Sequence, residues 1–148
     1  MNNKIILLVE DNPSDEELIL MSLEDSNIMN TIVVAHDGVE ALDYLFGTGK
    51  YAGRDLSITP QLILLDLKLP KLNGLQVLER LRADPRSLLI PVVILTSSSQ
   101  EEDIIAGYTR GANGYVRKPV EFKQFAEAVR QLGLYWLILN EAPLKSLP

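Results

Sequence analysis

Residues 62–66 read Leu-Ile-Leu-Leu-Asp, an unbroken apolar run that stops at a carboxylate. The same pattern recurs at residues 5–11, where Ile-Ile-Leu-Leu-Val precedes Glu-Asp, and at residues 92–96, where Val-Val-Ile-Leu precedes Thr. Short apolar runs without polar alternation are typical of parallel strands that are covered on both faces. The sequence therefore predicts a parallel sheet whose strands deliver polar side chains at one edge.

Segments of helical periodicity separate these runs, and Asn12-Pro13 is a favourable helix start. Five strands that alternate with five helices predict an α/β fold with an open, doubly wound sheet. The strands are expected at residues 5–9, 32–35, 62–65, 92–95 and 113–117, and the helices start near residues 13, 38, 75, 101 and 122.

Two helical segments carry more detailed predictions. Residues 99–102 read Ser-Gln-Glu-Glu, a capping-box pattern, and we expect Ile104, Ile105 and Tyr108 to form the buried face of the helix behind it. Residues 134–139 are six apolar residues in a row, which is too many for one buried stripe. Trp136 and Leu139 should continue the buried face of the last helix, and the second stripe would then be exposed; its members are Leu134, Tyr135 and Ile138.

Composition narrows the classes of function. The chain has 148 residues, 47% of them hydrophobic, a length that suits one domain. It has no cysteine and one histidine, which excludes thiolate sites and two-histidine metal motifs. A net charge of −6 with scattered basic residues argues against nucleic-acid binding. No stretch reaches the roughly 18 apolar residues of a membrane span. We expect a cytoplasmic protein.

Polar side chains follow four of the predicted strands. The first strand is followed by Glu10 and Asp11, the third by Asp66, the fourth by Thr96 and the fifth by Lys118. In open α/β sheets, ligands bind outside these carboxyl ends. Taken singly, each carboxylate is about as often a helix cap or loop residue as a site residue. A threonine in such a position is more often a turn residue than a site residue, and a lysine is usually a surface charge. Together the five indicate one site.

Three carboxylates at one edge repel one another, and a hard divalent cation, Mg²⁺ or Mn²⁺, relieves that repulsion. Asp66 can then act as a nucleophile and carry a phosphoryl group as an aspartyl-phosphate. Lys118 and the cation would neutralise charge on the phosphoryl oxygens, and Thr96 can donate a hydrogen bond to one of them. We therefore predict a reversible phosphorylation switch rather than an enzyme.

Four motifs surround the polar strand ends. They are Val9-Glu10-Asp11-Asn12-Pro13, Leu64-Leu65-Asp66-Leu67-Lys68-Leu69-Pro70 with Asn73-Gly74, Ile94-Leu95-Thr96-Ser97 and Gly111-Ala112-Asn113-Gly114-Tyr115-Val116-Arg117-Lys118-Pro119. In their order and spacing, and over about residues 4–132, they resemble the receiver domains of bacterial two-component response regulators. The resemblance implies a flavodoxin-like (βα)5 fold with strand order 2-1-3-4-5.

The resemblance also implies roles for individual residues. A histidine kinase would transfer the phosphoryl group to Asp66. The metal ligands would be Asp11, Asp66 and the backbone carbonyl of Lys68, with Glu10 acting directly or through water. Residues 1–148 would form one receiver domain, with its core at about residues 4–133 and a helix extension and tail at residues 134–148.

Two further implications concern the switch itself. Thr96 and Tyr115 would move together on phosphorylation, and the peptide bond between Lys118 and Pro119 would be cis. Two departures from the family pattern matter. Glu10 stands where the family more often has Asp, and Lys68 occupies a position that tunes the phosphate lifetime.

Other functions remain open at this point. A phosphohydrolase of the aspartyl-phosphate type needs a general acid at residue 68, where this chain has lysine. A flavodoxin-like cofactor binder needs a phosphate-cradling loop after the first strand, where this chain has Glu10-Asp11. A receiver-like adaptor that is never phosphorylated is a third alternative, against which the complete set of acceptor, metal ligands and lysine argues.

We expect the protein to pass on its signal through a surface that contacts another protein. We predict a homodimer through the C-terminal helix region, with a tail folded over its own domain as the alternative. The long connection at residues 47–60 is either a tolerated surface insertion or a loop that contacts a partner. This connection and the ending also resemble the small regulators paired with cyanobacterial and bacterial phytochromes, which suggests a phytochrome-type histidine kinase as the donor. The ending reads Gly133-Leu134-Tyr135-Trp136 and, further on, Asn140-Glu141-Ala142-Pro143.

Overall fold

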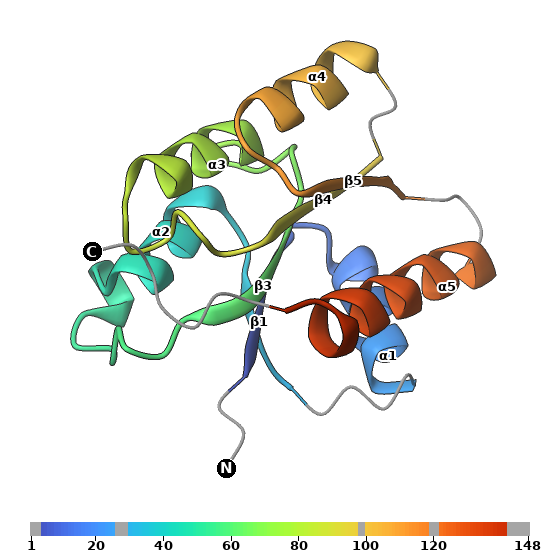
Figure 1. Ribbon diagram of the computed structural model, residues 1–148, viewed down its shortest axis with the longest axis horizontal. Helices are drawn as coiled ribbons and strands as arrows, with labels where there is room; N and C mark the ends of the chain where they lie inside the picture. Colours follow the sequence, from blue (N-terminus) through green and yellow to red (C-terminus); the bar gives the residue numbers. More distant parts are fainter. Residues whose placement is uncertain (1–3, 26–29, 98–99, 119–121, 142–148) are drawn as a thin grey trace.

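A single sheet organises the described chain (Figure 1). The computed structural model describes residues 4–25, 30–97, 100–118 and 122–141. All strand pairs are parallel, and the order is β2-β1-β3-β4-β5, which confirms the predicted flavodoxin-like topology. The strands are β1 (Ile5–Val9), β2 (Thr31–Ala35), β3 (Pro60–Leu65), β4 (Val92–Thr96) and β5 (Gly114–Arg117). The helices are α1 (Pro13–Asp25), α2 (Gly38–Phe46), α3 (Gly74–Ala83), α4 (Glu101–Thr109) and α5 (Phe122–Gly133).

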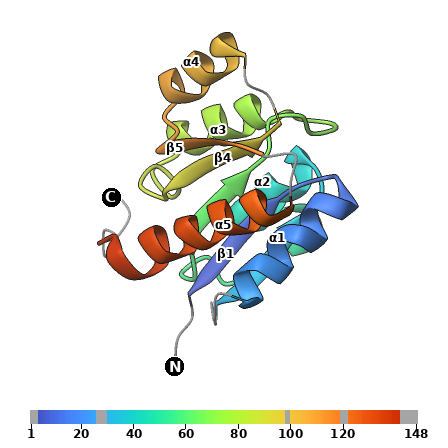
Figure 2. The ribbon, with the colours of Figure 1, turned by 90° about the vertical axis from the view of Figure 1, so that its right-hand side faces the viewer.

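The helices form a layer on each face of the sheet. Helices α1 and α5 lie side by side on one face, and α2, α3 and α4 cover the other (Figures 1 and 2). Side chains of β1 alternate between the two layers: Ile6 and Leu8 pack on the α1/α5 side, Leu7 and Val9 on the α2/α3 side. All four are almost completely buried, and each contributes roughly 1.5–3 kcal/mol by leaving water. Burial on both faces explains the continuous apolar runs.

The prediction for the buried face of α4 is wrong. Ile105 and Tyr108 are 57% and 50% exposed, and Ile104 is half-buried. The helix instead approaches the sheet through Gly107, where an added Cβ atom would lie 2.6 Å from Ile94 Cδ1. Since each residue turns the helix by about 100°, the neighbours of this contact point away from the sheet.

The start of α4 agrees with the expected position near residue 101. Helix α4 begins at Glu101 with Gln100 as N-cap, and the cap makes no side-chain hydrogen bond. The predicted cap, Ser99, lies outside the described residues, as does Pro119 with its predicted cis peptide bond.

Beyond α5 the chain widens into a π-helix at Leu134–Leu139. The Asn140 backbone N–H donates to the carbonyl of Tyr135 at 2.6 Å, five residues back, which is the π-helical spacing. Trp136 packs against the buried cluster between α1, α5 and the sheet, as predicted, and Tyr135 is half-exposed. Their rings meet edge to face with centroids 5.0 Å apart. The side chains at residues 137–139 lie outside the described part of the structure.

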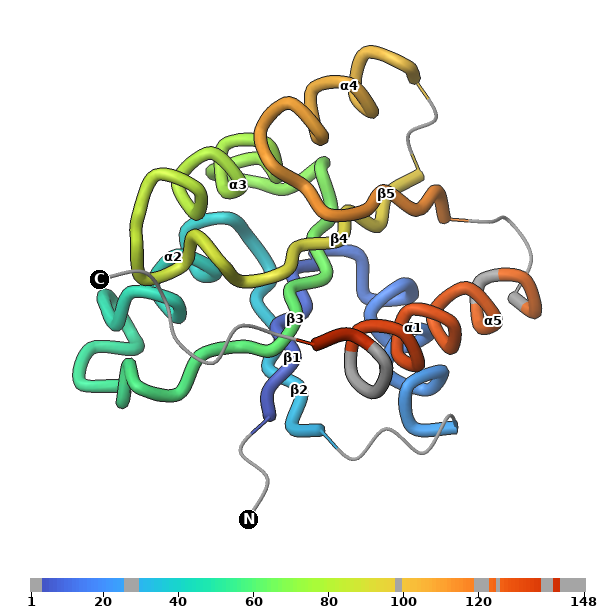
Figure 3. Tube along the Cα trace, viewed as in Figure 1, coloured from blue at the N-terminus to red at the C-terminus, as the bar shows by residue number. Residues whose placement is uncertain are grey.

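The long connection at residues 47–60 packs beside α2 (Figure 3). A 3-10 turn at Gly49–Tyr51 opens it, and the Arg54 guanidinium lies over the Tyr44 ring at 4.1 Å. Arg54 also donates to the carbonyls of Tyr44 at 2.6 Å and Ile58 at 2.9 Å. The carbonyls that end a helix have no partner within it, so Arg54 satisfies the end of α2 and shapes the loop.

None of the helices in the described residues combines the length and the apolar content that crossing a bilayer requires.

Candidate functional site

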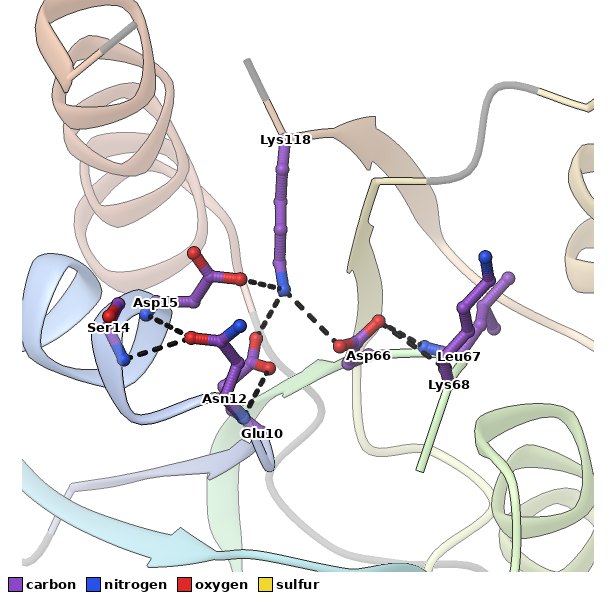
Figure 4. Close-up of polar contacts among 8 residues, drawn as sticks. All are labelled: Glu10, Asn12, Ser14, Asp15, Asp66, Leu67, Lys68 and Lys118. Carbon is purple, nitrogen blue, oxygen red and sulfur yellow. Dashed lines mark hydrogen bonds and ion pairs between the residues drawn. The ribbon is translucent and has the colours of Figure 1, made fainter. Parts of the chain in front are cut away.

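The carboxyl edge of the sheet brings together side chains from β1, β3 and β5 (Figure 4). Backbone hydrogen bonds continue the ladder past the strand ends: Asp66 N–H donates to Val9 at 3.0 Å and Lys118 N–H donates to Thr96 at 2.7 Å. Glu10 and Asp66 are buried, and Asp11 is exposed. Because the sheet fixes the backbone at each position, these side chains have little freedom to separate.

The carboxylates of Glu10, Asp11 and Asp66 form the group that suits a cation. One oxygen from each lies within 4.8 Å of the other two. Hard divalent cations prefer carboxylate oxygens, and a double positive charge would relieve the repulsion among three acids. The donor set therefore fits Mg²⁺ or Mn²⁺. The cluster consists of side-chain oxygens, and the predicted ligand role of the Lys68 backbone carbonyl stays a prediction.

Lys118 is the cation that the chain itself supplies. Its Nζ atom lies 2.6 Å from Glu10 Oε1, 2.8 Å from Asp15 Oδ2 and 3.3 Å from Asp66 Oδ2. An ammonium group has three protons, so these three carboxylates satisfy all of them. The Lys118 side chain is only 8% exposed, which strengthens each contact relative to a surface ion pair.

The Asp66 carboxylate is oriented from both sides. Its Oδ1 atom accepts from the backbone N–H of Leu67 at 2.7 Å and of Lys68 at 3.4 Å, and its Oδ2 atom faces Lys118. The loop after β3 folds back so closely that Gly74, at the start of α3, has no room for a Cβ atom. A Cβ atom there would lie 2.2 Å from the Asp66 carbonyl oxygen. Asp66 is thus held rigidly with one oxygen toward the lysine.

Thr96 ends β4 with a polar atom that lacks a partner. The residue is fully buried, and its Oγ1 makes no hydrogen bond within the described part of the chain. Leu65 of β3 pairs with Ile94 of β4, so the Thr96 side chain stands at the same sheet edge as Asp66. A buried hydroxyl without a partner costs free energy unless a ligand satisfies it. Tyr115 on β5 is half-buried and packs against the α2/α3 side of the core.

Burial and charge shift two pKa values in this cluster. Loss of hydration raises the pKa of Glu10 from 4.5 to about 7, assisted by the negative charge of Asp66 and opposed by the hydrogen bond from Lys118. Burial alone would lower the pKa of Lys118, but its hydrogen bonds to Asp15 and Glu10 and the charge of Asp66 outweigh this and raise it. The lysine is therefore charged at every physiological pH.

Sequence reasoning missed Asp15. Asp15 lies in the first turn of α1, where an acidic residue also interacts favourably with the helix dipole, and its carboxylate bonds directly to Lys118. The available signal was its position five residues after Glu10 in a turn that starts at the sheet edge. The cluster consequently holds four carboxylates, Glu10, Asp11, Asp15 and Asp66, against one ammonium group.

A parallel sheet of order 2-1-3-4-5 with acidic groups and a lysine at its carboxyl edge defines a receiver-type protein. The chain belongs to the response regulator receiver domain family, whose sequence profile matches residues 6–130. Response regulator Rcp1 of Synechocystis sp. is 39% identical over 134 residues, which cover 90% of this chain and 89% of Rcp1. The Mn²⁺-bound crystal structure of Rcp1 matches with a TM-score of 0.87 at 37% identity, over 95% of this chain and 99% of that one.

Two other solved structures are similar over most of the chain. The phosphorylated cyanobacterial phytochrome response regulator RcpA has a TM-score of 0.88 and 39% identity, covering 95% of this chain and 98% of its own. The bacteriophytochrome response regulator RtBRR has a TM-score of 0.76 and 51% identity, covering 97% and 86%. The protein is thus a receiver domain akin to phytochrome response regulators.

Proposed function

We propose that this protein is a phosphoacceptor response regulator that carries a transient phosphoryl group on Asp66. One observation carries the proposal: the buried Asp66 carboxylate faces Lys118 Nζ at 3.3 Å beside the carboxylates of Glu10 and Asp11. A nucleophile needs an orienting environment and nearby positive charge to react with a phosphoryl group, and both are present at this edge.

The transfer step balances in atoms and electrons. An Asp66 carboxylate oxygen forms a bond to phosphorus while the bond between phosphorus and the donor breaks, and the donor keeps that electron pair. With a phosphohistidine donor the broken bond is P–N, and with acetyl phosphate it is P–O. Lys118 stabilises the negative charge on the phosphoryl oxygens, and a divalent cation held by Glu10, Asp11 and Asp66 would supply further charge neutralisation.

Thr96 would couple this chemistry to conformation. Its buried Oγ1 has no hydrogen-bond partner in the described structure, and a phosphoryl oxygen on Asp66 is an acceptor it could donate to. Shifting a two-state equilibrium from 1:99 to 99:1 takes about 5.5 kcal/mol of differential stabilisation. New charge-assisted bonds from Thr96 and Lys118 are of that order together. Tyr115 is proposed to follow Thr96 in this change.

Intact-mass measurement after incubation with acetyl phosphate tests the proposal. We expect a base-labile phosphoryl adduct on the wild type with Mg²⁺, little without Mg²⁺, and none on Asp66→Asn, because the amide is not a nucleophile toward phosphorus. An adduct of equal yield on Asp66→Asn would place the chemistry elsewhere. No adduct on the wild type at saturating Mg²⁺, by acetyl phosphate or by a kinase, would favour the unphosphorylated adaptor.

The phosphoryl donor is proposed to be a histidine kinase of the phytochrome type. This is supported by the similarity to RcpA and RtBRR, which are described as a phytochrome and a bacteriophytochrome response regulator. Phosphotransfer from such a kinase, measured under red and far-red illumination, would test it. Equal transfer from an unrelated histidine kinase at the same rate would count against a specific pairing.

We further propose that the protein forms a homodimer through its C-terminal helix region. Tyr135 is 50% exposed on the π-helix that follows α5, and a second copy of the chain that covered this ring would remove its apolar surface from water. Light scattering over a concentration series should show the wild type approaching twice the monomer mass, with Tyr135→Glu remaining monomeric. A wild type that stays monomeric at every concentration, phosphorylated or not, would rule the dimer out.

A further inference from the structure

Lys118 has a carboxylate partner that lies outside the acidic triad. Asp15 in the first turn of α1 places Oδ2 2.8 Å from Lys118 Nζ, closer than Asp66 does at 3.3 Å. We propose that Asp15 is a positioning residue, which holds the Lys118 ammonium group beside Asp66 while Glu10 is engaged with a divalent cation. The proposal deepens the proposed phosphoacceptor function and in part rests on it.

The need for such a residue follows from how the carboxylates are shared. Glu10 and Asp66 are partners of Lys118, and both also belong to the triad that fits the cation. An ammonium group and a divalent cation compete for the same oxygens because like charges repel at these distances. Of the three carboxylates bonded to Lys118, Asp15 is the one outside the triad. It alone can keep its full charge for the lysine.

The first turn of α1 holds Asp15 in place for this task. The Asn12 side-chain carbonyl accepts from the backbone N–H of Ser14 at 2.9 Å and of Asp15 at 3.1 Å. A side-chain cap of this kind fixes the backbone of the first turn. The Asp15 carboxylate then extends from α1 toward Lys118 (Figure 4).

The arrangement also leaves a donor for the phosphoryl group. Lys118 has three protons, which in the structure go to Glu10, Asp15 and Asp66. With Glu10 engaged by a divalent cation, the N–H of Lys118 that now bonds to Glu10 would be free to donate a hydrogen bond to a phosphoryl oxygen on Asp66. The hydrogen bond that Lys118 donates to Asp15 is kept throughout, so the ammonium group stays at the reaction site instead of moving into solvent.

The lysine can be observed directly by proton–nitrogen correlation spectroscopy of its ammonium group, since a buried, hydrogen-bonded ammonium exchanges its protons slowly. At saturating Mg²⁺ we expect the Lys118 signal to persist in the wild type and to vanish in Asp15→Ala. The control is Glu17→Ala, which removes the same charge two residues along α1 from an exposed residue that is not bonded to Lys118. A signal that persists in Asp15→Ala, or one that Mg²⁺ abolishes in the wild type, overturns the proposal.

The rate of phosphoryl uptake gives the second readout. At saturating Mg²⁺, Asp15→Ala should accept a phosphoryl group from acetyl phosphate about tenfold more slowly than the wild type, the worth of one charge-assisted hydrogen bond, and Glu17→Ala at the wild-type rate. In a Lys118→Met background, adding Asp15→Ala should cause no further loss, because Asp15 acts through the lysine. Equal slowing by Glu17→Ala, or a full further loss in that background, contradicts the proposal.

The two readouts separate this inference from the proposed function. If the wild type accepts no phosphoryl group, the phosphoacceptor function fails, and the ammonium spectrum still decides whether Asp15 holds Lys118. If the wild type accepts the group and Asp15→Ala does so at the same rate, only the role of Asp15 fails.

Discussion

Replacing Lys118 by Met is expected to lower the free energy of unfolding of the metal-free protein by about 3–5 kcal/mol. Lys118 Nζ is the shared partner of Glu10, Asp15 and Asp66, and Glu10 and Asp66 are buried. Removing the lysine leaves these acids facing one another without a cation of the chain between them. Urea denaturation at pH 8 without divalent metal measures the loss. Lys71→Met is the control, because the Lys71 side chain is exposed and forms a long ion pair with Asp37, at 3.5 Å. This substitution should change stability by less than about 0.5 kcal/mol.

The loss should depend on pH in a defined direction. The pKa of Glu10 is raised by burial from 4.5 to about 7, so the contribution of Glu10 to stability is complete below about pH 4.5 and is lost as the pH rises through about 7. Removing Lys118 removes a hydrogen bond that lowers this pKa, which raises it further. The two proteins should therefore differ less in stability near pH 5 than near pH 8, because only the contact with Glu10 loses its charge in that range. A difference that grows toward low pH would contradict this assignment.

Magnesium should restore much of the stability that Lys118→Met loses. With the competing ammonium group gone, the oxygens of Glu10 and Asp66 are free for the cation, so Mg²⁺ should bind the variant more tightly than the wild type and stabilise it more. Thermal unfolding at increasing Mg²⁺ concentration measures both effects. Equal stabilisation of the two proteins would mean that Lys118 and the cation do not share these carboxylates.

Replacing Arg82 by Ala is expected to cost about 3 kcal/mol, because several backbone carbonyls lose their donor together. Its guanidinium donates to the carbonyls of Gly111, Leu88 and Ile90 and to Asn113 Oδ1, each at 2.9 Å. Arg82 thereby ties the end of α3 to the loops that precede β4 and β5. Those strands deliver Thr96 and Lys118 to the site.

Denaturant titration of Arg82→Ala, with Arg110→Ala as its control, measures this effect. Arg110 is an exposed arginine whose ion pair to Glu79 is 3.4 Å long, so its removal should cost less than about 0.5 kcal/mol. Arg82→Lys should recover only part of the loss, since an ammonium group cannot present the planar fork that reaches all four acceptors. Equal losses in the two alanine variants would mean that the hydrogen bonds of Arg82 contribute little.

The architecture could be predicted from the pattern of residues along the chain. The apolar runs and the intervening helical periods are local properties of the chain, and strands that are buried on both faces must be apolar at every position. With the family resemblance, they were enough to predict the strand order correctly. The same reasoning placed Glu10, Asp66 and Lys118 at one edge, because parallel strands all point their carboxyl ends the same way.

The rotation of α4 about its own axis depends instead on how the helix packs in three dimensions. The sequence of α4 offered several apolar residues, and it was the close approach of Gly107 to Ile94 that turned Ile105 and Tyr108 outward. The contact between Asp15 and Lys118 likewise joins residues 103 positions apart and depends on where α1 packs. In a strand, successive side chains point to opposite faces of the sheet, so the sequence shows which residues share a face. In a helix such as α4, the side that packs on the sheet also depends on the shape of the packing partner, which lies elsewhere in the sequence.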